Sequence, residues 1–477
     1  ADLLNCGGCG SAGPQPQHLK VWCEAGACHL GDCEPGFFDC DLDPSSGCEQ
    51  PMECKCTPGE VQPCYEGLLG TENVGACHGG TKTCAMDGMQ WGSCEGQVLP
   101  AEEKCANGID DDCNGGIDDI PDLDGDGWTV CDGDCCEQKF QCGSPELVNP
   151  GAFEFVGNQV DDDCDPNTPD DQPPPLCSTQ VKFKSVTAED VAKAIDLCQF
   201  VPKNPAPKDK KWGVVGAEFR LANGNAPGGQ MSNMQNFQAA ILQNYGTGGV
   251  VPKKGQTMAG ISSGRMRDQN DPEYTNPNGG SSFGSSSQPP AAYLAAHGGQ
   301  LPASFGCKGN CPAGNGANDS VNARIEIRVP TNAQSFSYKF KFFSAEYWTY
   351  ACTQYNDFYL ALLTSKAPNL PKDKNISFDG KGNPVSVNNG FFDVCVPKSC
   401  YTCPNGTVEL QGTGMQVGNT GGATQWLITK APIVPGETMV IELMVFDVSD
   451  GILDSLTILD DFAWSVTPSE VGTDPTG

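Results

Sequence analysis

The chain has 477 residues, enough for two to four domains, and a formal net charge of −32. Residues 1–174 hold 35 acidic and 5 basic side chains, whereas residues 175–477 hold 25 and 23. Because no basic face could displace counterions from phosphates, we expect no nucleic-acid partner. The chain has no run of 18 apolar residues, so we also expect no membrane span.

The chain contains 28 cysteines, twenty between Cys6 and Cys164 and eight between Cys177 and Cys403. Such density is typical of an oxidising compartment, so we expect every cysteine to be oxidised and each group to pair within itself. Zinc binding is the weaker interpretation, because there are only four histidines and no second C-x-x-C pair at finger spacing. The disulfide candidates are Cys6, Cys9, Cys113, Cys164, Cys307, Cys311, Cys400 and Cys403.

The chain starts with Ala-Asp-Leu-Leu and shows no leader segment. Together with the cysteine usage, this predicts a mature protein of the extracellular space or cell surface, after removal of a signal peptide. The lack of a C-terminal anchor segment leaves two interpretations open, processing or free secretion.

Residues 1–54 and 55–101 form two cysteine-rich modules. Their apolar residues are too few for a hydrophobic core, so disulfides must hold them. Residues 1–54 resemble short cysteine modules of myxobacterial surface proteins, with the pattern N-C-G-x-C-G, then G-F-x-D-C-D, then G-C-E. In residues 55–101, glycine, proline and cysteine predominate, which favours short strands and turns.

Residues 102–171 carry the strongest chemical signal, a D-x-D-x-D-G motif. Calcium takes about six to eight oxygen ligands, and alternate acids supply several while the glycine permits a sharp turn. The closing glutamate of an EF-hand is missing, because Gly133 stands there. The loop therefore resembles the looser calcium loops of dockerin and thrombospondin type 3 repeats. Its expected ligands are Asp122, Asp124, Asp126, the carbonyl of Trp128, Asp132 and Asp134.

The same region contains an internal repeat, because residues 103–114 match residues 154–165 in register. Each copy has a glutamate, an asparagine, and three adjacent aspartates followed by a cysteine. Most acidic runs are solvated linkers, but two copies in register argue for metal binding. The pattern resembles the metal-binding motif of large secreted bacterial proteins, found often in myxobacteria. The expected calcium ligands are Asn107, Asp110, Asp112, Asp118, Asn158, Asp161, Asp163 and Asp165.

Residues 172–211 contain a proline-rich, semi-rigid linker and a helix. Thr187 is a suitable N-cap, and acids follow it at positions 189 and 190. Val191, Ile195 and Cys198 have helical spacing, so we predict a short helix with these side chains on one face.

Residues 212–468 are typical of β structure. Apolar and charged side chains alternate in residues 322–329. In residues 335–343, Tyr338, Phe340 and Phe342 face away from Lys339 and Lys341. Further strands are expected at residues 355–364, 424–429, 438–447 and 455–466.

Many strands without a repeating helix predict a two-sheet sandwich. The predicted fold is mainly β. A disulfide-rich, calcium-loop N-terminal region of little regular structure precedes a large antiparallel β-sandwich with one short helix, and residues 469–477 form a tail.

Over about residues 212–466 the chain also resembles the choice-of-anchor L domain of bacterial surface proteins. The motifs that carry the resemblance are FSYKFKFFSAEY, YNDFYLALL, PVSVNN and FDVSDGILDS. The resemblance implies a protein that reaches the cell surface through one of several kinds of C-terminal anchor. The chain departs from the family at Ala345, where the family has the first of two glutamates, and in six extra cysteines.

Four acids, Glu346, Asp357, Asp447 and Asp454, lie at the ends of predicted strands, as does Asp450. The sequence leaves two interpretations open. They converge on a second calcium ion, or they are ordinary strand-end and turn acids.

These features predict an extracellular, calcium- and disulfide-stabilised structural protein of the bacterial surface. It would be a fibre, appendage or matrix subunit that associates with itself or with other surface proteins. The alternative is an adhesin or carbohydrate-binding protein, whose aromatic residues at 347–350 would stack on a sugar ring. We expect no enzyme, because the G-x-S-x-G motif around Ser262 lacks the helix and histidine context of a nucleophile elbow.

Overall fold

The computed structural model describes residues 17–24, 27–172, 176–177, 179–206, 209–306, 309–388 and 390–476. The chain divides into two compact units, Ala1–Pro121 with Thr129–Cys131, and Asp122–Trp128 with Asp132–Gly477. The acidic region is therefore shared between the two units. Within the described ranges, no helix combines the length and apolarity needed to cross a bilayer. The predictions for Cys6, Cys9 and Cys307 lie outside the described residues.

The first unit consists of turns, two hairpins and disulfides. Its strands are β1 (Leu19–Glu24) with β2 (Ala27–Cys33), and β3 (Val61–Cys64) with β4 (Gly80–Thr83). Among its described residues, every buried apolar side chain is a cysteine, namely Cys40, Cys48, Cys77, Cys84, Cys94 and Cys113. Sulfur bridges thus take the place of a hydrophobic core. The bridges between described residues are Cys33–Cys48, Cys40–Cys54, Cys56–Cys84, Cys64–Cys94, Cys77–Cys113 and Cys105–Cys131.

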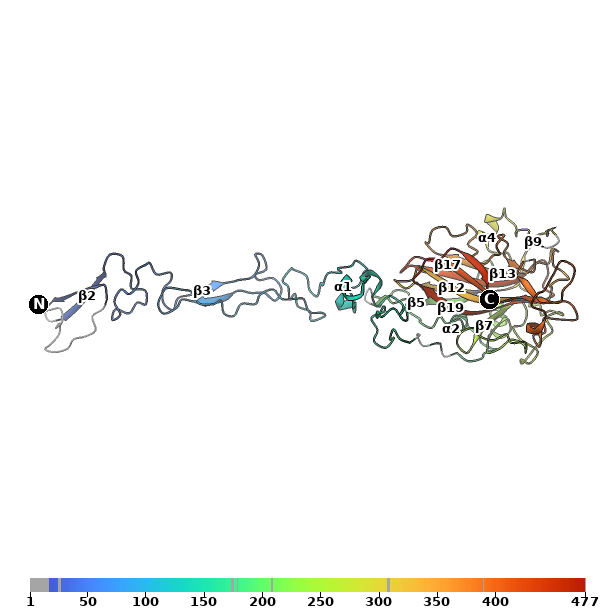
Figure 1. Ribbon diagram of the computed structural model, residues 1–477, viewed down its shortest axis with the longest axis horizontal. Helices are drawn as coiled ribbons and strands as arrows, with labels where there is room; N and C mark the ends of the chain where they lie inside the picture. Colours follow the sequence, from blue (N-terminus) through green and yellow to red (C-terminus); the bar gives the residue numbers. More distant parts are fainter. Residues whose placement is uncertain are drawn as a thin grey trace. The chain divides into compact units, whose positions relative to one another are not determined.

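The second unit contains two large antiparallel sheets (Figure 1), which confirms the predicted fold class. The six-stranded sheet has the order β14 (Val385–Ser386), β13 (Phe358–Thr364), β18 (Thr438–Asp447), β11 (Ala317–Arg328) and β5 (Gly213–Arg220), with β8 (Ser286–Ser287) beside β11. The eight-stranded sheet has the order β15 (Phe392–Cys395), β16 (Gly422–Thr424), β12 (Ser335–Ser344), β19 (Ser455–Ser465), β7 (Met258–Ser262) and β6 (Ala239–Leu242), with β17 (Leu427–Pro432) on β12 and β20 (Gly472–Pro475) on β17. A separate small hairpin joins β9 (Phe305–Gly306) and β10 (Gly309–Asn310).

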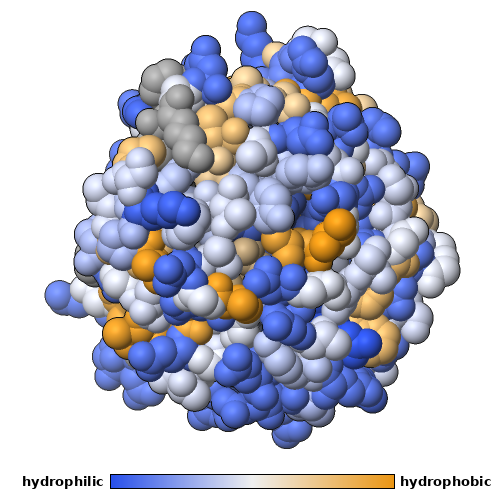
Figure 2. All heavy atoms as spheres, turned by 90° about the vertical axis from the view of Figure 1, so that its right-hand side faces the viewer, coloured by the Kyte–Doolittle hydropathy of each residue, from blue (hydrophilic) through white to orange (hydrophobic). Residues whose placement is uncertain are grey.

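The surface of the molecule is largely polar on the face shown in Figure 2. Hydrophobic side chains appear there in small, separate groups among hydrophilic ones. This distribution fits a fold whose apolar side chains lie mostly between the sheets and under the loops.

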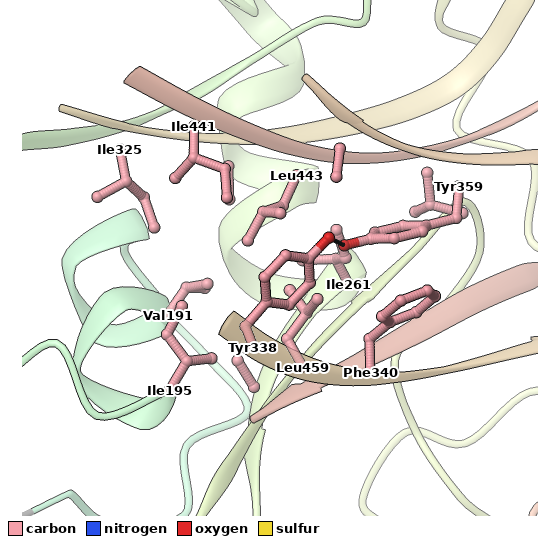
Figure 3. Packing of buried hydrophobic residues seen from close by; sticks show 14 of the residues in the cluster. Val191, Ile195, Ile261, Ile325, Tyr338, Phe340, Tyr359, Ile441, Leu443 and Leu459 are labelled. Carbon is pink, nitrogen blue, oxygen red and sulfur yellow. Dashed lines mark hydrogen bonds between the residues drawn. The ribbon is translucent and has the colours of Figure 1, made fainter. Parts of the chain in front are cut away.

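The core lies between the two sheets, as the period of two predicted. Ala323, Ile325, Ile327 and Val329 are at most 1% exposed. Figure 3 shows side chains of both sheets meeting there: Ile325, Ile441 and Leu443 on one side, and Ile261, Tyr338, Phe340 and Leu459 on the other.

The predicted helix forms as α2 (Ala188–Ala194). Thr187 caps it, because its side chain accepts a hydrogen bond from Asp190 N while the Asp190 carboxylate accepts one from Thr187 N. Val191 and Ile195 are buried in the core. The prediction for Cys198 was wrong: the helix ends at Ala194, and Cys198 is exposed and bonded to Cys177.

The described chain contains further helical segments, so the expectation of a single helix was too low. They are α1 (Lys139–Cys142), α3 (Met231–Asn233), α4 (Ala291–Ala296), the 3₁₀ turns Val130–Asp132, Pro145–Leu147, Gly228–Gln230 and Val408–Leu410, and the π turn Met234–Gln238.

The outer faces of both sheets are partly covered. A second apolar cluster, which includes Tyr245, Phe343 and Trp426, lies on the eight-stranded sheet, and a third, which includes Tyr293 of α4, lies on the six-stranded sheet. Lys341 faces away from the main core as predicted, yet it is fully buried. It donates to Glu409 (2.5 Å) and to the carbonyl of Thr424 (2.6 Å), so its charge is paired.

A hydroxyl chain crosses the core and allows a stability test. Tyr359 on β13 donates to the Tyr338 hydroxyl on β12 (3.0 Å), and that hydroxyl is hydrogen-bonded to Ser377 Oγ (2.9 Å). Tyr338→Phe leaves the buried Tyr359 hydroxyl without an acceptor, so we expect it to lower the free energy of unfolding by about 2–3 kcal/mol. Tyr359→Phe leaves Tyr338 bonded to Ser377 and should cost only about 1 kcal/mol. Urea denaturation measures both losses of unfolding free energy. Equal losses would contradict the order in which Tyr359 donates to Tyr338.

Candidate metal centres

The D-x-D-x-D-G motif forms a tight loop. We call residues 122–128 and 132–137 the central loop. The Asp122 carboxylate closes its first turn by accepting hydrogen bonds from Gly125 N (2.6 Å) and Gly127 N (2.9 Å). Gly127 has φ +93, a left-handed conformation that a glycine adopts without strain.

The central loop gathers five carboxylates. Oxygens of Asp122, Asp124 and Glu137 lie within 4.8 Å of one another, and so do oxygens of Asp124, Asp126 and Asp134. Asp124 belongs to both groups, so the two groups adjoin. Asp124 Oδ2 and Asp134 Oδ2 are buried without a hydrogen-bond partner among the described residues. Such orphaned oxygens suit a hard cation that needs several oxygen ligands.

Glu137 was missed by the sequence analysis. It lies beyond the twelve positions of an EF-hand, and the loop reaches it through a 3₁₀ turn that ends at Asp132. Its Oε2 accepts a hydrogen bond from Leu123 N (2.9 Å), which brings the end of the loop back to its start. Trp128, whose backbone carbonyl was expected as a ligand, is buried, and its backbone N–H donates to Asp126 Oδ1 (2.8 Å).

Burial and mutual repulsion make ionised carboxylates unfavourable in the central loop. Burial raises the pKa of Asp126 to about 7 and that of Asp134 to about 6, and neighbouring carboxylates add to both shifts. Burial, followed by Glu137 and Asp122, also raises the pKa of Asp124. None of the ion pairs among the described residues involves Asp124, Asp126 or Asp134. A divalent cation bound among these acids would neutralise their negative charge.

The two sequence repeats fold into the same turn. Asn107 Oδ1 accepts from Ile109 N (2.7 Å) while its Nδ2 donates to Asp111 (2.6 Å). The second copy repeats both bonds, from Val160 N to Asn158 (2.9 Å) and from Asn158 to Asp162 (2.8 Å). In each copy, the asparagine therefore stabilises the turn through both its amide oxygen and its amide nitrogen.

The glutamates and one later aspartate complete the shared turn. Glu103 Oε2 accepts from Asp111 N and Glu154 Oε2 from Asp162 N, each at 2.9 Å. Asp118 accepts from the backbone N–H groups of residues 107 and 108, and Asp170 accepts from those of residues 157, 158 and 159. Asp170 was missed because it lies one position out of register with Asp118.

The other aspartates that were predicted as calcium ligands have different surroundings in the two repeats. Oxygens of Glu103, Asp112 and Asp119 lie within 4.8 Å of one another, whereas Asp110 is buried and accepts from Asn114 N and Gly115 N. In the second copy, Glu154 Oε1 is buried without a hydrogen-bond partner among the described residues, and burial raises the pKa of Glu154 to about 7. Of the others, Asp161 is exposed, Asp163 accepts from Asp165 N, and Asp165 accepts from Asn167 N.

The cysteines next to the repeats form disulfides. Cys113 bonds to Cys77, and Cys164 bonds to Cys135 of the central loop. The other bridges in the second unit, among its described residues, are Cys136–Cys142, Cys177–Cys198, Cys311–Cys352 and Cys395–Cys403, and Cys400 is also disulfide-bonded. These pairs stay within their own half of the sequence, as expected. No thiolate of these cysteines is therefore free to bind a metal.

The central loop is fastened to the β-sandwich through Asn149, which is fully buried. Asn149 Nδ2 donates to Asp126 Oδ2 (2.6 Å), and Asn149 Oδ1 accepts from the hydroxyl of Thr331 (2.7 Å). Nearby, Asn332 accepts from Phe153 N (3.0 Å) and donates to Phe153 O (2.8 Å). Thr331 and Asn332 lie in the turn between β11 and β12. The region of the central loop is therefore joined to the β-sandwich at this turn.

Residues outside the metal region are placed as follows. Tyr347 is buried and stacks on Phe392 with ring centroids 4.0 Å apart, while Tyr350 is exposed. Ser262 is fully buried at the end of β7. The strand-end acids Glu346, Asp357, Asp447 and Asp454 are all buried, and Asp450 is half-buried.

Two family models match parts of the chain. A model described as "Choice-of-anchor L domain" matches residues 311–463. A model described as "Putative metal-binding motif", whose short name refers to copper, matches residues 100–119 and 145–170. The second match covers both repeats and leaves the central loop outside. Comparisons with curated proteins and with solved structures gave no match.

The matches and the structure agree on the class of protein. The chain contains a β domain similar to the choice-of-anchor L domain, together with a region similar to a metal-binding motif. With its many disulfides, this composition indicates an extracellular or surface protein. The acidic clusters and the motif indicate a metal.

The bridging role of Asn149 can be tested by mutation. Asn149→Ala leaves Asp126 Oδ2 and the Thr331 hydroxyl without their shared partner, so we expect it to lower the free energy of unfolding by about 1–3 kcal/mol. Amide exchange should also become faster in residues 122–128. Asn167→Ala is the matched control, because Asn167 is exposed and its side chain bonds only to Asp165 within the described residues. If both variants behave alike, Asn149 does not fasten the loop.

Proposed function

We propose that the protein is a calcium- and disulfide-stabilised structural component of the bacterial surface, such as a fibre, appendage or matrix subunit. The central loop carries this proposal, because it combines five converging carboxylates with a direct connection to the β-sandwich. The disulfide-cored first unit supports it as well, since this arrangement suits a protein that must last outside the cell.

Calcium fits the donor atoms better than copper. Copper sites in proteins rely on imidazole, thiolate or thioether ligands. Residues 100–170 contain no histidine and no methionine, and Cys113 and Cys164 are in disulfides. The oxygens of aspartate and glutamate are what remains, and these suit a hard cation such as calcium.

Association between copies would use the second unit. Residues 175–477 are almost neutral, so copies of this part can approach without the repulsion of the acidic half. Within the described residues, β20 pairs with β17 on one side and with no strand on the other, which leaves an edge that a neighbouring strand could extend.

An adhesin is the second candidate, favoured by a cavity of about 410 Å³ in the second unit. Its described lining includes the half-buried residues Phe153, Trp212 and Trp464 together with Glu154. Aromatic faces next to polar groups are a typical arrangement for binding a small organic ligand such as a sugar. Of the aromatic residues proposed from the sequence, Tyr347 is 3% exposed and stacks on Phe392, whereas Tyr350 is exposed.

Calcium removal tests the metal. Saturating calcium at about 100 times its Kd should stabilise the second unit by about 2.7 kcal/mol relative to chelator, and calorimetry would show the higher melting temperature. Asp124→Asn should remove much of this increase, because Asp124 belongs to both carboxylate groups. Asp171→Asn makes the same charge change at an exposed position and should keep it. A melting temperature that calcium does not change would overturn the calcium assignment.

Electron microscopy and sedimentation test the structural role. With calcium present, we expect the purified chain to form ordered polymers, and native surface material to show the same repeat. Polymerisation through strand edges should leave the spectroscopic signature of the β-sandwich unchanged. A chain that stays monomeric at high concentration, together with native material that shows no polymer, would favour the adhesin. A glycan array with Trp212→Ala as the binding-deficient variant would then test the cavity.

A further inference from the structure

Four carboxylates from both sheets meet at one end of the β-sandwich. In the six-stranded sheet, Asp357 directly precedes β13 and Asp447 ends β18, and the register Phe358 to Phe446 makes them neighbours. In the eight-stranded sheet, Asp454 directly precedes β19 and Glu346 follows β12, and the register Ser344 to Ser455 brings these ends together. We call these four residues the strand-end cluster.

Hydrogen bonds join the two sheets at this cluster. Ser455, at the start of β19, donates from its hydroxyl to Asp357 Oδ2 (2.6 Å). The other oxygen of Asp357 accepts from Val448 N (3.1 Å). Because Ser455 and Asp357 belong to different sheets, the acids lie between the layers rather than on an outer surface.

The cluster is buried and incompletely bonded. Glu346, Asp447 and Asp454 are each 2% exposed and Asp357 is 1% exposed. Glu346 Oε2, Asp447 Oδ1 and Asp454 Oδ2 have no hydrogen-bond partner among the described residues. The ion pairs formed by the described part of the chain include none of the four acids. Burial foremost, with help from neighbouring carboxylates, raises the pKa of Glu346 and Asp447.

The surrounding backbone is arranged to hold these acids in place. Asp454 Oδ1 accepts from Ser281 N (3.0 Å), and Asp319 nearby accepts from Phe283 N (3.1 Å) and Ser285 N (2.9 Å), so the loop at 281–285 closes over the site. At Gly264 an added Cβ would lie 1.9 Å from the Asp454 carboxyl carbon. Only a glycine therefore allows this carboxyl its position.

Protonation alone does not satisfy the cluster. A shared proton can join Asp357 and Asp447, but the unpartnered oxygens of Glu346 and Asp454 would remain buried without a bond. A hard divalent cation takes carboxylate oxygens from several chain segments at once and neutralises their charge.

We infer that Glu346, Asp357, Asp447 and Asp454 bind a calcium-type divalent cation that links the two sheets. This site lies outside the residues matched by the metal-binding motif, and it does not depend on the central loop. Its ligands come from segments far apart in the sequence, so the cation would fasten the end of the sandwich as a disulfide fastens two distant segments.

Counting bound ions tests the inference. Full-length protein in calcium, examined by native mass spectrometry, should lose about one bound calcium when Asp447 is changed to Asn. Asp474→Asn is the control, because Asp474 is an exposed acid of the same unit and should keep the full count. An unchanged count in Asp447→Asn overturns the site.

A second measurement keeps the test valid if Asp447→Asn fails to fold. In full-length Asp124→Asn protein, whose central loop is impaired, residues 346–357 and 447–455 should exchange amide hydrogens more slowly in calcium than in chelator. The slowing should be about tenfold when calcium is at ten times its Kd. If exchange in these segments is the same in calcium and chelator, the cluster binds no calcium, whatever the central loop does.

Discussion

Buried negative charge is the constraint on which this structure depends. Oxygens of Asp124 and Asp134 in the central loop, Glu154 in the second repeat and three strand-end acids are buried without partners among the described residues. An uncompensated buried charge costs several kcal/mol. The chain cannot neutralise its 60 acids with 28 basic residues, and the fully buried Lys341 is already engaged with Glu409. Cations from the medium are the remaining source of positive charge.

The placement of the central loop gives this constraint a structural consequence. The two family matches are separate in the sequence, yet one compact unit contains both the second repeat and the β-sandwich. Asn149 links them, because its amide contacts Asp126 on one side and Thr331 on the other. The turn between β11 and β12 therefore connects the central loop to one strand of each sheet.

Much of the fold could be predicted, because its signals are local. Alternation placed Ile325 and Phe340 in the core, and the N-cap at Thr187 with the acids that follow it placed α2. Some failures have long-range causes. The burial of Lys341 depends on loops that cover the outer face of its sheet, and Glu137 is brought to the central loop by a connection of irregular length. One failure was local: Asn107 and Asn158 were interpreted as metal ligands, although they bond partners only two and four residues away and thereby build turns.

Disulfides occur in both units, and a cation bound by a carboxylate cluster would link distant parts of the chain in the same way. A small or highly charged segment cannot bury enough apolar surface to fold by itself, so it needs links between distant parts of the chain. Both links depend on the medium: disulfides need an oxidising compartment, and weak oxygen-ligand sites need the high calcium found outside cells. Inside a reducing, calcium-poor cytoplasm, the cysteine core would be absent and the acidic loops would repel one another. With calcium as the proposed cation, the extracellular medium is the compartment that supplies both kinds of link.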